Sequence, residues 1–350
     1  MWLCGITFLL LTILSQVHAR YRADATDNVV VYYGQNSWGL SHNNVKYQDD
    51  WQGRLEDHCN DTNIDVINIA FLIDMVNLEL NLANLDGDKD LCPDGLKYCK
   101  NMEDDIKTCQ ENGKQIVLSI GGQYTHDLRT FKNSEEARKS AQKIWRVFGP
   151  RSADGGSEKR PFGNSTVDGF DLDIETPGIK YLPEWAEEMR RLTKDHKILL
   201  TASPECSHNF TGTEGPMTEL LKSNVTFDYM NVQFYNNKDC WVQDTAEIQL
   251  PFLQQWSSWA NRAKSQWLVG LAAGQHACNS IDCYKDDMSL FDKPKSYSGF
   301  TGMMAWDASH LKDNKGFLSK AKNALKTSVT STVTFPSSTS VAVTTSTTSS

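Results

Sequence analysis

Residues 167–176 read Val-Asp-Gly-Phe-Asp-Leu-Asp-Ile-Glu-Thr. Acidic and apolar side chains alternate along this stretch, which is the period-two pattern of a β-strand. Side chains two positions apart in a strand share a face and lie about 6.6 Å from each other. Asp171, Asp173 and Glu175 are therefore expected to project together from one face, while the apolar residues between them project from the other.

Crowding among these carboxyl groups has a chemical consequence. Mutual repulsion and partial burial raise the pKa of at least one of them, and protons are then shared across the set. A carboxyl group that keeps its proton near neutral pH can act as a general acid. We assign this proton to Glu175, the outermost of the three. Asp168 breaks the alternation, and Gly169 could permit a bulge beside it, so the direction of Asp168 stays open.

The acidic stretch has two inert alternatives, a calcium site and a solvated acidic edge. Calcium loops place their acidic ligands in flexible, glycine-containing segments. The residues between the acids here are Phe170, Leu172 and Ile174, which favour a buried strand over a loop.

Short apolar runs recur along the whole body of the chain. The eight runs are residues 29–33, 66–71, 115–119, 169–173, 198–202, 229–233, 267–271 and 302–306. Amphipathic helical patterns lie between several of them, at residues 134–148, 185–196 and 252–263. Strands that alternate with helices predict parallel strands joined by crossovers. Eight such units predict an α/β fold, a closed (β/α)8 TIM barrel formed by residues 28–324, with an open doubly wound sheet as the alternative.

The two ends of the chain differ from its body. Residues 1–19 contain a short apolar stretch followed by Val17-His18-Ala19, a pattern typical of a secretory signal peptide, with a membrane anchor as the alternative. Residues 327–350 are rich in Ser and Thr and predict a disordered tail or linker. Once the signal is removed, no remaining stretch is long and apolar enough to span a membrane.

Composition supports export and excludes some functions. The net charge of −9 gives no sign of a nucleic-acid-binding surface. Eight cysteines follow residue 19, an even count that favours disulfides in an exported chain but leaves the pairing undetermined. No Cys-x-x-Cys pair occurs, so we expect no zinc site, and no metal or other cofactor. The N-glycosylation sequons are at Asn60, Asn164, Asn209 and Asn224.

The acidic stretch resembles the Asp-x-x-Asp-x-Asp-x-Glu signature of family 18 glycoside hydrolases, the chitinase family. Further segments resemble the class III (hevamine-like) branch of plant and fungal endochitinases. These segments are residues 32–36, 68–72, 119–122, 233–237 and 304–307. The resemblance extends over residues 28–324 and includes all eight expected strands.

The resemblance implies a substrate-assisted, retaining mechanism. Glu175 would protonate the oxygen between two N-acetylglucosamine units, and the 2-acetamido oxygen of the sugar would attack C1. Asp173 would hold the acetamido N–H, Asp171 would share a proton with Asp173, and Tyr235 would aim the acetamido oxygen. Glu175 would then activate water.

The resemblance also implies a sugar-binding groove. Trp306 looks like the tryptophan beneath the sugar next to the cleaved bond. Other candidate groove residues are Gln233, Tyr32, Asp168 and Asn236. Glu205 is a further candidate, since it stands where the family has a glutamine. We expect Glu205 to alter a polar contact with substrate and to shift the pH optimum.

A disulfide map is implied in the same way, with pairs Cys59–Cys109, Cys92–Cys99 and Cys206–Cys240. Cys278 and Cys283 remain, and these two could close a small loop.

The expected function is therefore a secreted, monomeric chitinase that binds chitin or its oligosaccharides. The Ser/Thr-rich tail suggests association with a cell wall. Three alternatives stay open: a non-catalytic chitin-binding lectin or inhibitor on the same barrel, an endo-β-N-acetylglucosaminidase acting on N-glycans, and a structural wall protein.

Overall fold

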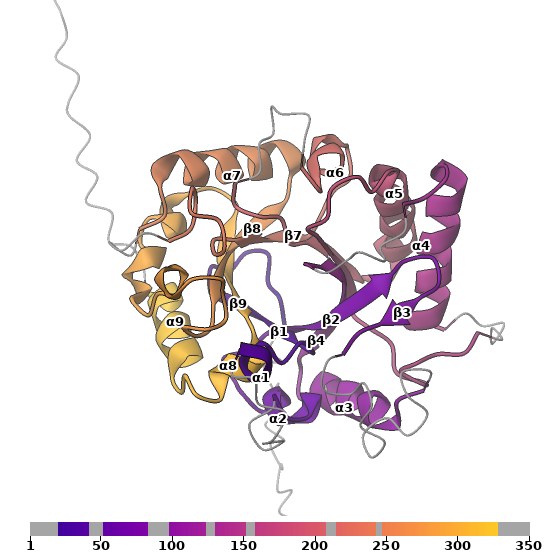
Figure 1. Ribbon diagram of the computed structural model, residues 1–350, viewed down its shortest axis with the longest axis horizontal. Coiled ribbons are helices and arrows are strands. Elements are labelled where there is room, and N and C mark those ends of the chain that lie inside the picture. Colours follow the sequence, from indigo (N-terminus) through magenta and orange to yellow (C-terminus); the bar gives the residue numbers. More distant parts are fainter. Residues whose placement is uncertain are drawn as a thin grey trace, which may run out of the picture.

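The strands of the protein form a closed parallel barrel (Figure 1). The computed structural model describes residues 20–41, 52–82, 98–123, 130–151, 158–207, 215–242 and 247–327. The barrel strands are β1 (Asn28–Tyr33), β2 (Val66–Asp74), β4 (Gln115–Gly122), β5 (Gly169–Ile174), β6 (Leu199–Ala202), β7 (Tyr229–Gln233), β8 (Gln266–Ala272) and β9 (Phe300–Trp306). β1 pairs with both β2 and β9, which closes the ring. The (β/α)8 prediction is confirmed, and the open-sheet alternative is wrong.

Helices surround the barrel on its outside (Figure 1). The α-helices are α1 (Ser37–Ser41), α2 (Leu55–Cys59), α3 (Lys100–Glu111), α4 (Ser134–Phe148), α5 (Leu182–Thr193), α6 (Thr218–Lys222), α7 (Leu250–Ala263), α8 (Ala308–Leu311) and α9 (Phe317–Lys326). The 3-10 turns are η3 (Lys194–His196), η4 (Ile281–Cys283), η5 (Met288–Phe291) and η6 (Pro294–Ser296). None of the helices within the described ranges has the length and apolar character that crossing a bilayer would require.

The structure adds details that the apolar pattern does not contain. The short strand β3 (Glu79–Leu80) pairs antiparallel with the end of β2. Helices α5 and α7 each begin a few residues earlier than expected, and both have a proline in the first turn. Proline is favoured there because the first backbone N–H groups of a helix have no partner within the helix. The apolar periodicity of a helix marks only the turns that pack against the barrel, so it does not predict the first turn.

Alternating side chains build two separate apolar layers. Phe170, Leu172 and Ile174 belong to the layer between the strands and the helices, where the ring of Phe170 lies 6.3 Å from that of Trp145. A second, smaller cluster that includes Val30 fills the barrel interior. The expected alternation of strand β5 is therefore confirmed, and its acidic residues face inward.

A buried ion pair joins the last helix to the barrel. The Nζ of Lys322 on α9 contacts Oδ2 of Asp65, and both side chains are less than a tenth exposed. The same carboxylate oxygen accepts a hydrogen bond from the backbone N–H of Val29, at 2.8 Å. Because β1 and β2 begin at this point, the pair fixes α9 against the amino-terminal end of the barrel.

Three disulfides connect elements of the described structure, Cys59–Cys109, Cys206–Cys240 and Cys278–Cys283. They agree with the expected pairs. Cys92 lies outside the described residues, so its pairing with Cys99 stays a prediction. The signal peptide (residues 1–19), nearly all of the tail (328–350) and the sequon at Asn209 also lie outside them. Asn60, Asn164 and Asn224 have exposed side chains.

We expect Lys322→Ala to destabilise the protein by about 3 kcal/mol or more, because it leaves a buried carboxylate without its counter-ion. Urea unfolding followed by circular dichroism would measure the change. The matched control is Lys320→Ala on the same helix, which removes an exposed pair with Asp286 and should cost less than about 1 kcal/mol. Equal losses in the two variants would contradict a stabilising role for the buried pair.

Candidate active site

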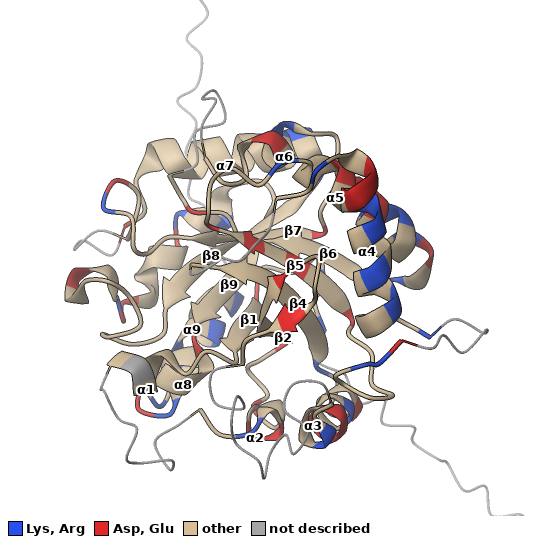
Figure 2. Cartoon of the chain, turned by 45° about the vertical axis from the view of Figure 1, so that its right-hand side comes forward, with Lys and Arg blue, Asp and Glu red and all other residues tan. Residues whose placement is uncertain are grey.

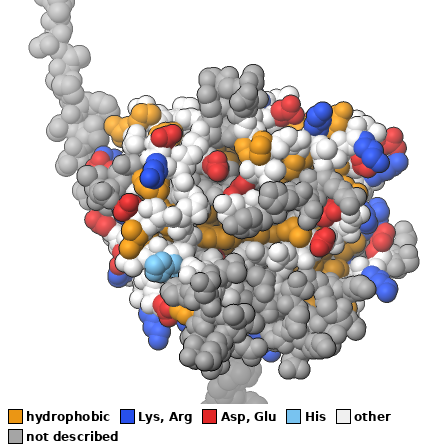
Figure 3. Space-filling model, in the orientation of Figure 1, with side chains coloured by type: hydrophobic (Ala, Val, Ile, Leu, Met, Phe, Trp, Pro, Cys, Tyr) orange, Lys and Arg blue, Asp and Glu red, His pale blue; other side chains and the backbone are white. Residues whose placement is uncertain are grey.

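Strand β5, which carries the acidic residues, ends at the mouth of the barrel. Acidic segments lie on strands inside the barrel, and the outer helix α4 carries many basic residues (Figure 2). Asp171 is fully buried, Asp173 is 2% exposed and Glu175, just after the end of β5, is half-buried. In Figure 3 this face is hollowed along a central band of hydrophobic side chains, with acidic side chains near it. The three carboxyl groups thus form a series from the barrel interior to its mouth.

Asp171 is held by hydroxyl groups from other strands. It accepts hydrogen bonds from Thr201, Ser119 and Tyr32, each at 2.7 Å. Ser203 donates to it as well, at 3.0 Å. Burial raises the pKa of Asp171, and the hydroxyl donors oppose that rise by stabilising the anion.

Asp173 and Glu175 are hydrogen-bonded to each other through their side chains. The Nε2 of Gln233 donates to Oδ1 of Asp173 at 2.8 Å and lies 3.3 Å from Oε1 of Glu175. Burial, followed by the charges of Glu175 and Asp171, raises the pKa of Asp173 well above its usual range. The titrations of the two groups are consequently coupled.

Burial raises the pKa of Glu175 to about 7. The negative charge of Glu205 contributes to this rise, whereas the hydrogen bonds from Gln233 and Asp173 oppose it. A carboxyl group with such a pKa exists partly in the protonated form at neutral pH, and it can return as a base after giving up its proton. These are the properties expected for Glu175 as a general acid.

An aromatic platform lies at the mouth. Trp306 ends β9 and is half-buried, and its ring stacks on that of Phe71 with centroids 5.9 Å apart and planes at 21°. The ring of Tyr32 lies 5.4 Å from that of Trp306. An exposed aromatic face of this kind packs against the C–H face of a sugar ring. The expected position of Trp306 in the site is supported by this arrangement.

Phe71 was missed by the reasoning from sequence. Ala70 and Phe71 are consecutive, yet both belong to the inner cluster, whereas Ile69 and Leu72 belong to the outer one. The ladder between β2 and β4 shifts between Ala70 and Leu72, and this bulge lets two successive side chains face inward. Strict alternation would have placed Phe71 outside the barrel.

Tyr235 follows β7 directly and is 5% exposed. Burial and the charges of Asp173 and Glu175 raise its pKa well above the usual range. The phenol therefore keeps its proton and can act as a hydrogen-bond donor. Its hydroxyl has no hydrogen-bond partner among the described residues, so it is available to a ligand.

Tyr32 and Gln233 have a different role from the expected one. Tyr32 is 1% exposed, and its hydroxyl is engaged by Asp171 and by Ser203, 2.6 Å away. Gln233 is 4% exposed and is hydrogen-bonded to Asp173 and to the carbonyl oxygen of Ser203. Both residues therefore position the carboxyl groups, and their contact with substrate stays a prediction.

Asp168 does not lie in the groove. Its carboxylate accepts hydrogen bonds from the backbone N–H of Ile116 at 2.9 Å and from Nε2 of Gln110 at 2.8 Å. These contacts fix the amino-terminal end of β5, whereas Glu175 follows the opposite end of the strand. The assignment of Asp168 to substrate binding is wrong, because the whole length of β5 separates Asp168 from Glu175 at the mouth of the barrel.

Asn236 and Glu205 lie beyond the ends of β7 and β6. The Oδ1 of Asn236 accepts a hydrogen bond from the N–H of Asn279 at 2.8 Å, which joins two loops. Glu205 is exposed and pairs with Gln233 in an isolated parallel bridge. Of these two candidates, only Glu205 influences the charge of Glu175.

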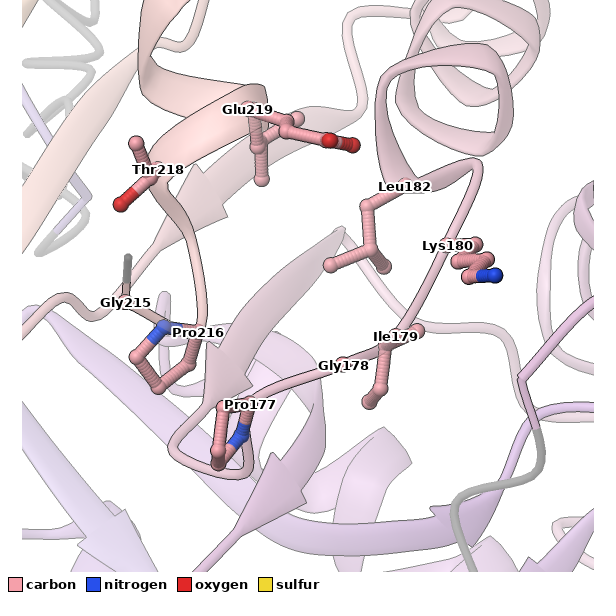
Figure 4. Close-up of a pocket in the computed structure, with 10 residues that line it drawn as sticks. Pro177, Gly178, Ile179, Lys180, Leu182, Gly215, Pro216, Thr218 and Glu219 are labelled. Carbon is pink, nitrogen blue, oxygen red and sulfur yellow. The ribbon is translucent and has the colours of Figure 1, made fainter. Parts of the chain in front are cut away.

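A cavity of about 380 Å³ begins two residues after Glu175 (Figure 4). It lies between the loop with Pro177 and Ile179 and the start of α6, and it contains one cationic side chain, Lys180, and one acidic side chain, Glu219. None of its lining residues is aromatic. The aromatic platform of Trp306 and Phe71 is therefore separate from this cavity.

A barrel with a proton-sharing carboxyl pair beside an aromatic platform defines the class of glycoside hydrolases. The model of glycosyl hydrolases family 18 matches residues 28–341, and the chain belongs to this family. It is 33% identical over 332 residues to Endochitinase 33 of Trichoderma harzianum, covering 91% of this chain and 97% of the relative. It is also 33% identical to the Class III chitinase of Arthroderma benhamiae, covering 84% and 88% of the two chains.

A solved structure with a similar fold has a different named role. The xylanase–α-amylase inhibitor protein XAIP-I, solved in complex with trehalose, has a TM-score of 0.66 and is 25% identical, covering 85% of this chain and 99% of its own. The same barrel thus supports an inhibitor, so the function of this chain has to be argued from its site.

We expect Glu205→Gln to shift the alkaline limb of the pH–rate profile to lower pH. Activity requires protonated Glu175 and falls as the pH rises through its pKa, and removal of the Glu205 charge lowers that pKa. Rates on a soluble oligosaccharide across the pH range would measure the shift. Glu111→Gln at the end of α3 makes the same change of charge at the other end of the barrel, and it should leave the profile in place. Superimposable profiles for all three proteins would overturn this role of Glu205.

Proposed function

We propose that the protein is a secreted chitinase that hydrolyses β-1,4 bonds between N-acetylglucosamine units. The observation that carries the proposal is the placement of Asp173 and Glu175 on the one amide of Gln233, at the mouth that also holds the aromatic platform of Trp306 and Phe71. The named relatives are chitinases, which is consistent with this substrate.

The separation of the carboxyl groups favours a substrate-assisted reaction. Ordinary retaining glycosidases place two carboxyl groups about 5–5.5 Å apart, on opposite sides of the bond, and one of them is the nucleophile. The Nε2 of Gln233 lies 2.8 Å from Asp173 and 3.3 Å from Glu175, which favours a side-by-side pair of carboxyl groups over an opposed one. In family 18 the 2-acetamido group of the substrate is the nucleophile, and we propose the same for this protein.

In the proposed reaction Glu175 donates its proton to the bridging oxygen as the bond from that oxygen to C1 breaks. The acetamido oxygen forms a bond to C1, which gives a cyclic oxazolinium ion and releases the leaving sugar with a hydroxyl group. Glu175 then takes a proton from water, and the resulting hydroxide adds to C1 and reopens the ring. Two displacements at C1 retain its configuration.

The neighbouring residues support these steps. Asp173 lies where its carboxylate can accept the acetamido N–H and stabilise the positive ring. Tyr235 donates its free hydroxyl to the acetamido oxygen and aims it at C1. Asp171, held by its hydroxyl donors, raises the pKa of Asp173 and shares a proton with it. Trp306 supports the sugar ring from below.

The other functions predict different behaviour. A lectin or inhibitor would bind chitin oligosaccharides without turnover. An endo-β-N-acetylglucosaminidase would release glycans from a high-mannose glycoprotein and leave chitin oligomers intact. A structural wall protein would fractionate with the wall and show no hydrolysis. The retained acid Glu175 and the proton it shares with Asp173 favour hydrolysis over binding alone.

Export, sugar attachment and cell-wall association are part of the proposal. The disulfides and the exposed sequon residues Asn60, Asn164 and Asn224 are compatible with an extracellular protein. The proposed signal peptide agrees with export, and the Ser/Thr-rich tail agrees with association with a cell wall. We propose that the secreted form acts as a monomer.

We expect Glu175→Gln to reduce kcat on chitin oligomers by about 10³-fold, because the amide cannot donate or regain the proton. Binding of a chitin oligomer, followed by tryptophan fluorescence, should persist. Glu111→Gln is the charge-matched control and should retain full turnover. Substantial hydrolysis by Glu175→Gln would refute its role as the acid.

The products should carry the β-anomeric configuration when they are first released. Proton NMR of a chitin hexamer during the first minutes of hydrolysis distinguishes the two anomers. Initial α-anomer would indicate inversion and exclude the substrate-assisted path.

A further inference from the structure

Glu205 continues an inward-facing series of side chains. Thr201 on β6 and Ser203 just after it both donate hydrogen bonds to Asp171 inside the barrel. Glu205 is the next residue with the same parity, two positions further along extended backbone. Its side chain is exposed, so the series ends at the mouth of the barrel.

A backbone bridge places Glu205 beside the catalytic carboxyl groups. The N–H of Gln233 donates to the carbonyl oxygen of Pro204 at 2.9 Å, and the N–H of Cys206 donates to that of Gln233 at 3.1 Å. These bonds set Glu205 directly opposite Gln233, with both side chains on one face. Since the amide of Gln233 reaches Glu175, the carboxylate of Glu205 borders the same site.

This carboxylate has no counter-ion among the residues that the structure describes. Within the described ranges, its side chain takes part in no ion pair and no hydrogen bond. The charge of Glu205 raises the pKa of both Asp173 and Glu175, so the three acidic groups at the mouth repel each other. A cation brought by the ligand would relieve this repulsion and form a charge-assisted hydrogen bond with Glu205.

We propose that, in partially deacetylated chitin, Glu205 binds the ammonium group of a glucosamine unit next to the cleaved bond. The inference rests on the proposed function. In that reaction the sugar attacked at C1 must keep its acetamide, so the glucosamine occupies a neighbouring subsite. Glu205 is then a specificity-determining residue that separates a cationic sugar from its neutral, acetylated counterpart.

The test uses chitosan of mixed acetylation as substrate. Wild-type protein and Glu205→Gln digest it to the same low conversion, each at its own pH optimum. Mass-spectrometric sequencing of the products then gives the fraction of glucosamine in the units that flank the cleaved bonds. We expect enrichment of glucosamine on one side of the bond in the wild type. Glu205→Gln should lower this preference by roughly three- to tenfold, the range expected for one partly exposed charge-assisted contact.

Two variants control the comparison. Glu205→Asp keeps the charge and should keep part of the preference. Glu111→Gln, distant from the site, should match the wild type. High salt should reduce the wild-type preference, since exposed charges are screened. Melting temperatures close to that of the wild type exclude misfolding as the cause.

The same glucosamine fraction in wild type and Glu205→Gln would overturn the inference, and so would a preference that Glu205→Asp loses completely. Hydrolysis of a fully acetylated hexamer is measured in parallel. Failure of the wild type to cleave that hexamer would overturn the proposed function instead.

Discussion

Negative charge buried inside a barrel is the constraint on which the rest of the structure depends. A carboxylate removed from water is costly unless hydrogen-bond donors replace the water. Asp171 obtains such donors from Tyr32 on β1, Ser119 on β4 and Thr201 on β6. Ser119 and Thr201 are the register neighbours of Asp171 on the strands beside β5, whereas Tyr32 reaches it from β1, which is not a neighbour of β5 and comes within reach because the barrel is closed. The site therefore depends on closure of the barrel.

The supply of donors decreases toward the mouth, and this gradient determines where the proton resides. Asp171 is surrounded by hydroxyl groups, whereas Asp173 and Glu175 share the single amide of Gln233 and each other. The protein thus stabilises charge at the bottom of the strand and retains a proton at the top. Glu205 adds a further negative charge at the mouth, which strengthens this tendency and at the same time alters the surface that a ligand meets.

Much of the fold and part of the site could be predicted from local patterns. The direction of a side chain along a regular strand depends only on position, so the common inward face of Asp171, Asp173 and Glu175 followed from alternation. Helix α4 matched its apolar periodicity at both ends, for the same local reason. The placement of Trp306 at the mouth followed from its position at the end of the last strand.

The remaining features were decided by tertiary structure. The bulge in β2 that turns Phe71 inward has no local signal, because it arises from the register between two strands. Tyr32 donates a hydrogen bond to Asp171, which is 139 residues away in the sequence. Asp168 accepts a hydrogen bond from the backbone N–H of Ile116 at the opposite end of the barrel. Sequence therefore determined which residues carry the chemistry and which face they share. Their partners were set by strand register and ring closure, which are properties of the whole packed barrel and not of any single segment.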